Sequence, residues 1–297
     1  MSKVWLVTGS ARGLGRHIAE AVLAKGDRLV ASARDPQRLH DLVERYGEQI
    51  RTVALDVTDS AAAQAAVQLA VDAFGRLDVL VNNAGFGHVA PFEQADEEDF
   101  RAQIETNFYG VVNVTRAAVP VMRKQRAGHI IQISSVGGRL GTPGLSAYQA
   151  AKWAVGGFSE VLNLELAPLG VKVSTLEPGG MRTDWGVIAG NDVPAIDPDY
   201  QPTVGALVEM FGPYIGHETS DPAKVAEVVL RLGYHEHPPL HLLLGSDAVH
   251  LAGQADRTRA ASGDEWREVS LSTDFAASVI PAFPAGTPAS AFVFPAD

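Results

Sequence analysis

A tyrosine and a lysine four residues apart, Tyr148 and Lys152, are the side chains of this sequence best suited to moving a proton. The surrounding apolar pattern predicts a helix over residues 147–166, and residues four apart on a helix lie on the same face. A lysine ammonium beside a phenol stabilises the phenolate and lowers its pKa from about 10 towards neutrality, which suits a general acid or base. Such pairs also arise by chance on solvated helix faces, so the pair needs support from other residues.

Two further polar side chains give this support. Ser135 follows a predicted strand at residues 129–133, and Asn107 lies inside a predicted helix over residues 97–123. Parallel α/β sheets bind ligands beyond the carboxyl ends of their strands. Ser135 and a glycine-rich turn near the start of the chain are both expected at that edge.

The glycine-rich turn follows the first predicted strand, residues 4–7, and leads into a predicted helix over residues 13–25. Glycines let the backbone approach a pyrophosphate closely, while free N–H groups and the helix dipole favour the anion. The Gly-x3-Gly-x-Gly spacing differs from the Gly-x-Gly-x-x-Gly fingerprint of many dinucleotide enzymes, and a tight turn that simply requires glycines is the alternative. The residues expected to contact a cofactor here are Thr8, Gly9, Ser10, Arg12, Gly13, Leu14 and Gly15.

The end of the second predicted strand, residues 28–33, distinguishes between two nicotinamide cofactors. An acidic residue at this place binds the adenosine ribose hydroxyls, whereas a cation can pair with a 2′-phosphate. Here Arg34 comes first and Asp35 follows, and both Arg12 and Arg38 can reach the same place. We therefore predict NADP(H) in preference to NAD(H). The alternative is that Arg34 is merely an exposed arginine and that NAD(H) is the cofactor.

The elements that must position these residues alternate along the chain. Short apolar segments rich in β-branched residues alternate with longer amphipathic segments, which predicts helices on both faces of one parallel sheet. We therefore expect an α/β fold with a single Rossmann-type, doubly wound parallel sheet of about seven strands. The predicted strands span residues 4–7, 28–33, 52–55, 79–81, 129–133, 171–176 and 240–244, and the predicted helices span residues 13–25, 37–46, 61–74, 97–123, 147–166 and 222–232.

The 297 residues are expected to divide into one large domain and an appended segment. Residues 1–245 form the dinucleotide-binding and catalytic domain, with a substrate lid at about residues 184–220. Residues 246–297 form a C-terminal helical extension and a proline-rich tail, and the sequence leaves open whether this tail is disordered or docked. Five lid residues are expected either to line an apolar substrate pocket or to pack the lid on the sheet: Trp185, Ile188, Met210, Phe211 and Tyr214.

Composition excludes several kinds of function. The net charge of −11 repels nucleic-acid phosphates and anionic membrane surfaces. The absence of cysteine excludes disulfides and thiolate chemistry and fits a reducing compartment. No signal-peptide pattern and no apolar run of about 18 residues is present, so we expect a cytoplasmic protein without a membrane partner. His235, His237 and His241 resemble a metal-ligand cluster, but two prolines interrupt them, and we expect a solvated turn and no metal.

Several motifs in the right order make the chain resemble the short-chain dehydrogenase/reductase family, and within it the NADP-linked branch similar to 17β-hydroxysteroid dehydrogenases. The resemblance runs from about residue 3 to residue 244, and Ser135 and Tyr148 stand 13 residues apart as in the family. Two residues depart from the family pattern: Ala151 stands where many members have serine, and Met181 stands where many have valine or isoleucine. The motifs are Thr8-Gly9-x3-Gly13-x-Gly15, Asp56-Val57, Asn82-Asn83-Ala84-Gly85, Asn107, Ser135, Tyr148-x3-Lys152 and Pro178-Gly179-x-Met181-x-Thr183.

The resemblance implies a role for each of these residues. Tyr148 would exchange a proton with the substrate oxygen during hydride transfer, and Ser135 would hold and polarise that oxygen. Lys152 would lower the pKa of Tyr148 and hold the nicotinamide ribose, and Asn107 would anchor a water molecule that leads to solvent. Asp56 would contact the adenine, and Thr183 the nicotinamide carboxamide. The remaining cofactor contacts that the resemblance implies are Val57, Asn83, Ala84, Gly85, Pro178, Gly179 and Met181.

These observations together predict an NADP(H)-dependent ketoreductase or carbonyl reductase. Its substrate would be a hydrophobic ketone, aldehyde or secondary alcohol, hydroxysteroids among them. An alternative from another class is a redox-sensing regulator that binds NADP(H) without turning it over, although such a protein would have little reason to keep four matched catalytic positions. The predicted helices 97–123 and 147–166 carry apolar residues beyond one face, so we expect a homodimer or homotetramer.

Overall fold

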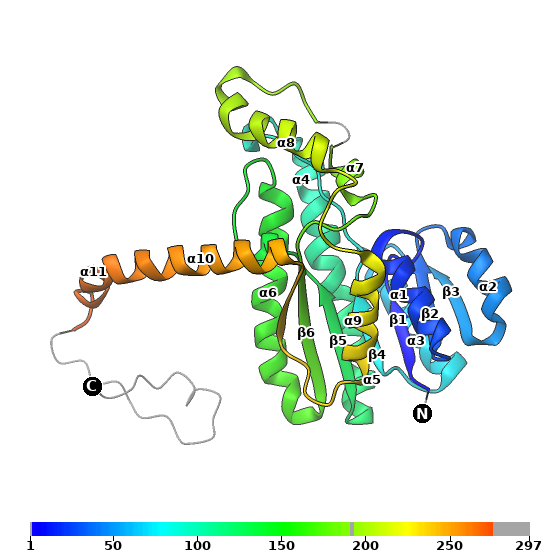
Figure 1. Ribbon diagram of the computed structural model, residues 1–297. Helices are drawn as coiled ribbons and strands as arrows, with labels where there is room; N and C mark the ends of the chain where they lie inside the picture. Colours follow the sequence, from blue (N-terminus) through cyan, green and yellow to red (C-terminus); the bar gives the residue numbers. More distant parts are fainter. Residues whose placement is uncertain (1, 191–192, 276–297) are drawn as a thin grey trace. The chain divides into compact units, whose positions relative to one another are not determined.

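Within the part of the chain that the structure describes, residues 2–190 and 193–275, seven parallel strands form one sheet with helices on both faces (Figure 1). The structure is a computed structural model. The strand order is β3-β2-β1-β4-β5-β6-β7, so the chain starts near the middle of the sheet and builds outward in two directions. This order confirms the doubly wound parallel sheet predicted from the sequence. The strands are β1 Val4–Val7, β2 Arg28–Ala33, β3 Ile50–Ala54, β4 Val79–Asn82, β5 Gly128–Ile133, β6 Val171–Pro178 and β7 His241–Leu244.

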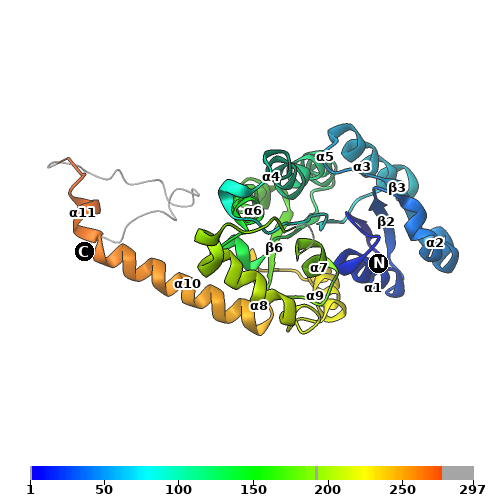
Figure 2. The same ribbon diagram turned by 90° about the horizontal axis from the view of Figure 1, so that it is seen from above.

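Alternating side chains send the apolar residues of each strand into two separate cores. In β1, Trp5 and Val7 join one core, whereas Val4 and Leu6 join the other, because successive side chains of a strand point to opposite faces. Figure 2 shows the helices on the two sides of the sheet. The first core is closed by α1 Gly13–Ala24, α2 His40–Tyr46 and α9 Pro222–Tyr234, and the second by α3 Ser60–Phe74, α5 Gly110–Gln125 and α6 Ser146–Leu166.

The helix predicted over residues 97–123 is confirmed in extent, since residues 97–125 are helical throughout, but it contains a π turn that the sequence did not predict. Helix α4, Glu97–Ile104, is joined to α5 by a π turn at Glu105–Tyr109 that contains Asn107. The side-chain amide of Asn107 forms hydrogen bonds with the backbone of Phe86, outside the helix. A single π turn is a frequent feature of functional sites because it redirects a side chain without ending the helix. The tertiary contact with Phe86 therefore accounts for the interruption.

The predicted lid region contains two short helices above the carboxyl ends of the strands (Figure 1). These are α7, Trp185–Gly190, and α8, Ala206–Tyr214. A small third core of Val89, Leu145 and Val204 packs against half-buried lid residues, among them Trp185 and Tyr200. The lid is thus attached to the body of the domain by apolar contacts of its own.

The chain divides into two compact units, Met1–Ala252 and Gly253–Asp297, and the boundary falls inside helix α10, Ser246–Glu265. The first unit contains the sheet, the lid and every residue predicted for the site. The described residues of the second unit form the rest of α10 and the short helix α11, Arg267–Leu271. The predicted proline-rich tail from residue 276 onward lies outside the described residues. No described helix is both long enough and apolar enough to cross a membrane.

Candidate active site

Ser135, Tyr148 and Lys152 come together beyond the carboxyl end of β5. Ser135 lies two residues after that strand ends, and its hydroxyl forms a hydrogen bond with the hydroxyl of Tyr148 on α6. One helical turn further along α6, Nζ of Lys152 donates to the backbone carbonyl of Ile133 at 2.8 Å and lies 5.6 Å from the centroid of the Tyr148 ring. The spacing of four residues therefore places both side chains on the face of α6 that meets the end of the strand.

Burial has the largest effect on the pKa values of this cluster. Removal from water raises the pKa of Tyr148 to about 12, and the hydrogen bond with Ser135 offsets only part of that rise. Burial lowers the pKa of Lys152 to about 8 because burial disfavours the charged ammonium. The expectation that Lys152 lowers the pKa of Tyr148 towards neutrality is therefore wrong for this structure. The lysine amine donates to Ile133, and desolvation of the phenol dominates.

Asn107 lies beside the cluster, held by the segment that follows β4. Its Nδ2 donates to the carbonyls of Phe86 at 2.7 Å and Gln103 at 2.8 Å, and its Oδ1 accepts the N–H of Phe86 at 3.2 Å. A Cβ atom on Gly85 would lie 2.5 Å from Oδ1 of Asn107 and 3.7 Å from Nζ of Lys152. Gly85 thus occupies the place where Asn107 and Lys152 approach each other, and the four predicted catalytic residues form one neighbourhood.

The turn after β1 offers backbone N–H groups to an anion. Gly9 and Gly13 have φ angles of +69° and +54°, in the region that favours glycine, and a Cβ atom on Gly15 would collide with the carbonyl oxygen of Gly9. Helix α1 begins at Gly13, and its N-cap residue, Arg12, makes no side-chain hydrogen bond to the first-turn N–H groups. These groups therefore remain available, and the turn fits the pyrophosphate of a dinucleotide.

Other residues predicted for this turn hold its shape. The hydroxyl of Ser10 donates to a backbone carbonyl three residues earlier at 2.8 Å, and Leu14 is buried in the first core. Oγ1 of Thr8 accepts the N–H groups of Asn83 at 2.9 Å and Ala84 at 3.0 Å. These hydrogen bonds join the end of β4 to the glycine turn, so the two predicted cofactor segments are fixed to each other.

The edge expected to bind the adenosine end carries exposed cations. Arg34 and Arg38 are both exposed, whereas the carboxylate of Asp35 accepts a backbone N–H at 3.1 Å and caps the 3-10 turn that follows. Hydrogen bonds from the backbone and side chain of Thr58 lower the pKa of Asp56, with a smaller contribution from the charge of Arg34. Asp35, the acid next to Arg34, is therefore engaged in capping, whereas Arg34 and Arg38 remain at the surface.

Two residues predicted to bind the cofactor contact other parts of the protein. Nη1 of Arg12 lies 3.4 Å from Oδ2 of Asp184, at the start of the lid. Val57 is buried, and a Cβ atom on Gly110 would lie only 2.5 Å from its Cγ2 atom. Arg12 is thus directed towards the lid, and the side chain of Val57 packs against α5.

The loop after β6 is held by Asp247, a residue that the sequence did not indicate. Its carboxylate accepts the N–H of Gly180 at 2.7 Å and the hydroxyl of Thr219 at 2.9 Å, and a Cβ atom on Gly179 would collide with it. Asp247 lies far from this loop in sequence, and no local motif marks it. Of the other residues predicted here, Pro178 ends β6. Met181 forms an isolated β-bridge with Ser220, and the hydroxyl oxygen of Thr183 accepts the N–H of Trp185.

Trp185 is the predicted lid residue that contacts the catalytic cluster. The centroids of the Trp185 and Tyr148 rings lie 5.1 Å apart. A Cβ atom on Gly87 would lie 3.0 Å from atoms of both rings. Gly87, which the sequence did not indicate, therefore leaves the space in which the two rings meet.

The other predicted lid residues are spread over a wider area. The hydroxyl of Tyr214 lies against Gly180, where it would collide with any Cβ atom. Ile188 and Phe211 are half-buried, and Met210 is 60% exposed. The structure therefore brings one of the five predicted residues against the catalytic tyrosine.

The histidines between α9 and β7 form no metal centre: within residues 2–190 and 193–275, no three His, Asp or Glu side chains are arranged to hold a metal ion. His241 contacts Glu177 through Nδ1 at 2.9 Å and Glu160 through Nε2 at 3.2 Å. The hydrogen bond with Glu177 raises the pKa of His241. The expected solvated turn thus describes the exposed His235 and His237 but is wrong for His241.

A parallel sheet in this order, with a glycine turn after its central strand and two half-buried hydroxyls and a buried lysine at the same edge, is the arrangement of a dinucleotide-dependent oxidoreductase of the doubly wound type. Comparison with known proteins identifies the family. Residues 3–191 match the family model described as short chain dehydrogenase. The chain belongs to the short-chain dehydrogenase/reductase family and is an oxidoreductase.

Similar proteins cover most of the chain. Oxidoreductase BOA17 of Botryotinia fuckeliana is 51% identical over 276 residues, which are 92% of this chain and 100% of that protein. The crystal structure of a short-chain dehydrogenase from Streptomyces avermitilis has a TM-score of 0.84 and 38% identity, and covers 93% of this chain and 100% of its own. The alcohol dehydrogenase of Thermococcus sibiricus complexed with 5-hydroxy-NADP has a TM-score of 0.68 and 26% identity, and covers 83% of this chain and 97% of its own.

Proposed function

We propose that this oxidoreductase transfers a hydride between NADP(H) and the carbonyl carbon of a hydrophobic ketone or aldehyde, or the corresponding secondary alcohol in reverse. The observation that carries the proposal is the cluster of half-buried Ser135 and Tyr148 with buried Lys152, at the sheet edge that also holds the glycine turn. The dinucleotide supplies the hydride chemistry when bound. The protein supplies proton transfer, orientation and exclusion of water.

The side chains divide the work by their hydrogen bonds. Tyr148, with a pKa of about 12, carries its proton at neutral pH and donates it to the oxygen of a carbonyl substrate. Ser135 shares a hydrogen bond with Tyr148, so both hydroxyls can face the same substrate oxygen and stabilise its developing charge. Lys152 would hold the nicotinamide ribose of the bound dinucleotide. Asn107 fixes the wall beside Lys152 through Phe86.

The glycine turn and the edge next to it would hold the dinucleotide. The free N–H groups at the start of α1 would bind the pyrophosphate. Arg34 and Arg38 would pair with a 2′-phosphate, which supports NADP(H) over NAD(H), because the capping role of Asp35 withdraws the nearest acid. Solved relatives hold NADP in some structures and NADH in another, so a nicotinamide cofactor is common to them.

Oxidation of NADPH in the presence of a panel of carbonyl compounds tests the reaction class. The panel includes aryl ketones, aldehydes, polyketide-like ketones and ketosteroids, and the reverse reaction uses alcohols with NADP+. Tyr148→Phe should lower turnover at least ~10²-fold, the low end for loss of a general acid, while the affinity for NADPH stays nearly unchanged. Full activity of this variant would contradict the mechanism. Tight NADPH binding without turnover of any panel member would favour a redox-sensing regulator.

The cofactor preference has its own test. Arg34→Asp should lower the ratio of kcat/KM for NADPH to that for NADH at least ~10-fold, because a charge-assisted contact is lost and a repulsive one is created. Arg123→Asp, which changes an exposed arginine near the end of α5, is the matched control and should leave the ratio unchanged. An unaltered ratio for Arg34→Asp would indicate that NAD(H) serves equally well.

A further inference from the structure

The first residues of the lid lie over the start of helix α1. A Cβ atom on Gly13, the first residue of that helix, would lie 3.7 Å from Cβ of Thr183 and 3.8 Å from Oδ1 of Asp184. The other oxygen of the same carboxylate, Oδ2, lies 3.4 Å from Nη1 of Arg12. Asp184 therefore places a negative charge at the end of α1 where we expect the pyrophosphate of the cofactor. The proposed transfer of hydride and proton makes no use of this carboxylate.

The start of α1 attracts a carboxylate because it lacks one of its own. Helices α3, α4 and α9 each follow an aspartate whose side chain accepts hydrogen bonds from the first turn: Asp59, Asp96 and Asp221. Arg12 takes that place before α1 without such a hydrogen bond, and the first turn of α1 contains no acidic residue. Free N–H groups and the helix dipole make this end of α1 positive, and the carboxylate of Asp184 lies beside it.

The ion pair of Arg12 and Asp184 can readily exchange partners. The two side chains are 42% and 48% exposed, and an ion pair at this level of exposure is screened by water and adds little stability. A phosphate group offers Arg12 a bidentate partner. Arg12 is also one of the residues that we expect to contact the cofactor. The lid carboxylate and a cofactor phosphate therefore compete for one guanidinium.

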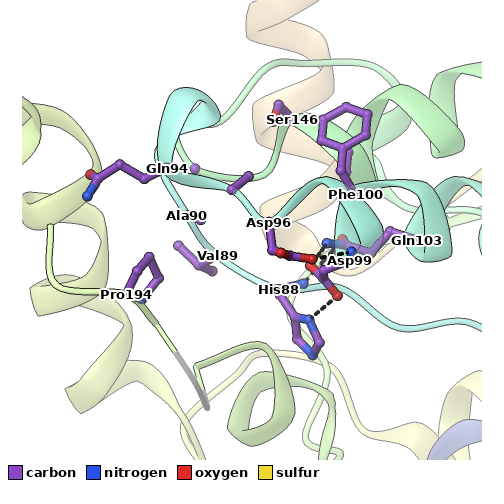
Figure 3. Close-up of a pocket in the computed structure, with 13 residues that line it drawn as sticks. His88, Val89, Ala90, Gln94, Asp96, Asp99, Phe100, Gln103, Ser146 and Pro194 are labelled. Atoms are coloured by element: carbon purple, nitrogen blue, oxygen red, sulfur yellow. Dashed lines mark hydrogen bonds and ion pairs between the residues drawn. The ribbon is translucent and has the colours of Figure 1, made fainter.

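A second contact holds the lid independently of Arg12. The side chain of Gln94 donates to the carbonyl of Ala195 at 2.9 Å and accepts the N–H of Asp197 at 3.1 Å. Gln94 and Pro194 both line the cavity shown in Figure 3, and neither side chain carries a charge. A variant at Asp184 thus changes the charge at the start of α1 and leaves this second contact in place.

We infer that Asp184 competes with the cofactor phosphates for Arg12 and for the start of α1, and thereby lowers the affinity of the protein for the dinucleotide. The inference rests on the proposed binding of a nicotinamide cofactor at the glycine turn. The pyrophosphate is common to NADPH and NADH, so the inference holds whichever of the two the protein prefers. Asp184 is in this sense a residue that sets the strength of cofactor binding.

Calorimetric titration of the full chain with NADPH, NADH and inorganic pyrophosphate tests the inference. Asp184→Asn keeps the size of the side chain and removes its charge. At low ionic strength it should bind each of the three ligands at least about threefold more tightly, the factor expected for one screened contact between like charges. Salt weakens such a contact further, so the gain in affinity should shrink as the ionic strength rises to about 0.5 M.

Two variants separate the charge of Asp184 from other effects of the lid. Asp199→Asn removes the same charge from the exposed lid turn at Pro198–Tyr200, and should leave the three affinities unchanged. Gln94→Ala loosens the lid at its second contact without changing a charge, and should not reproduce the gain in affinity.

Several outcomes would overturn the inference. These are unchanged or weaker binding by Asp184→Asn, a gain that does not depend on salt, and an equal gain in Asp199→Asn or Gln94→Ala. If neither NADPH nor NADH binds to the unmodified protein or to Asp184→Asn, the proposed function fails instead, and the titration with pyrophosphate alone decides the role of Asp184. Binding of none of the three ligands would overturn both.

Discussion

The buried amine of Lys152 predicts a loss of activity above about pH 8. Burial lowers its pKa from 10.5 to about 8, which corresponds to about 3 kcal/mol at 1.36 kcal/mol per pKa unit. About nine tenths of the lysine side chains are charged at pH 7, but only about one tenth at pH 9. The proposed role of Lys152, holding the nicotinamide ribose, uses the ammonium form. We therefore expect kcat/KM for carbonyl reduction to fall about tenfold between these two pH values.

Initial rates of NADPH oxidation at constant ionic strength measure this decline. In Lys152→Arg the decline should disappear, whatever the absolute rate, because a guanidinium stays protonated over the whole range. Lys124→Arg changes an exposed lysine on α5 and should keep the decline of the unmodified protein. A profile that stays flat to about pH 9, or the same decline in Lys152→Arg, would refute the assignment to Lys152.

An effect of Lys152 on folding stability cannot explain the decline in activity above pH 8. The pKa of Lys152 is lower in the folded protein than in the unfolded chain, so between about pH 8 and 10.5 the unfolded chain binds more protons at this position. The contribution of Lys152 to the free energy of unfolding therefore rises with pH over this window. Activity that falls while this contribution rises points to the charge of the amine, and urea unfolding at pH 7 and pH 9 separates the two effects.

Two further predictions concern the cofactor turn and the last strand. Gly15→Ala places a Cβ atom against the carbonyl of Gly9 and should weaken NADPH binding at least ~10-fold, as measured by calorimetric titration. Gly157→Ala, at a position with open space around it, is the control and should leave the affinity for NADPH unchanged. Equal affinities of the two variants would contradict the role of the turn. Glu177 raises the pKa of His241, so the stabilisation is complete below about pH 6.5 and is lost as the pH rises through the folded pKa. His241→Gln should therefore reduce the free energy of unfolding more at about pH 5.5 than at about pH 8.5, and a pH-independent difference in urea titrations would contradict this.

The sheet was predictable because its strands carry local information. Val4 to Val7 are all apolar, as strands covered on both faces require, and the structure sends Trp5 and Val7 to one core and Val4 and Leu6 to the other. Strict alternation of such strands with helices leaves few topologies, of which the doubly wound sheet is the common one. The spacing of Tyr148 and Lys152 is also local information, because residues four apart lie on one face of a helix.

The features that the sequence did not reveal depend on contacts between distant segments. Asn107 sits in a π turn in which its amide bonds to Phe86, and although Gly110 follows this turn, a single glycine does not predict a π turn rather than a regular helix. Asp247 supports the loop after β6 across many intervening residues. His88 and Asp99 pair only once α4 folds back on the segment after β4. Each of these becomes visible only when the tertiary arrangement is known.

The pKa values bear on the direction of proton transfer. A phenol with a pKa of about 12 is ionised in only about one in 10⁵ molecules at pH 7. The groups now around Tyr148 thus make it a proton donor, which suits reduction of a carbonyl. Oxidation of an alcohol needs a base, and the pKa must first fall by several units through a positive charge brought close to the phenol. Lys152 can supply that charge without releasing the carbonyl of Ile133, because its ammonium carries three donors and its Nζ already lies 5.6 Å from the centroid of the Tyr148 ring.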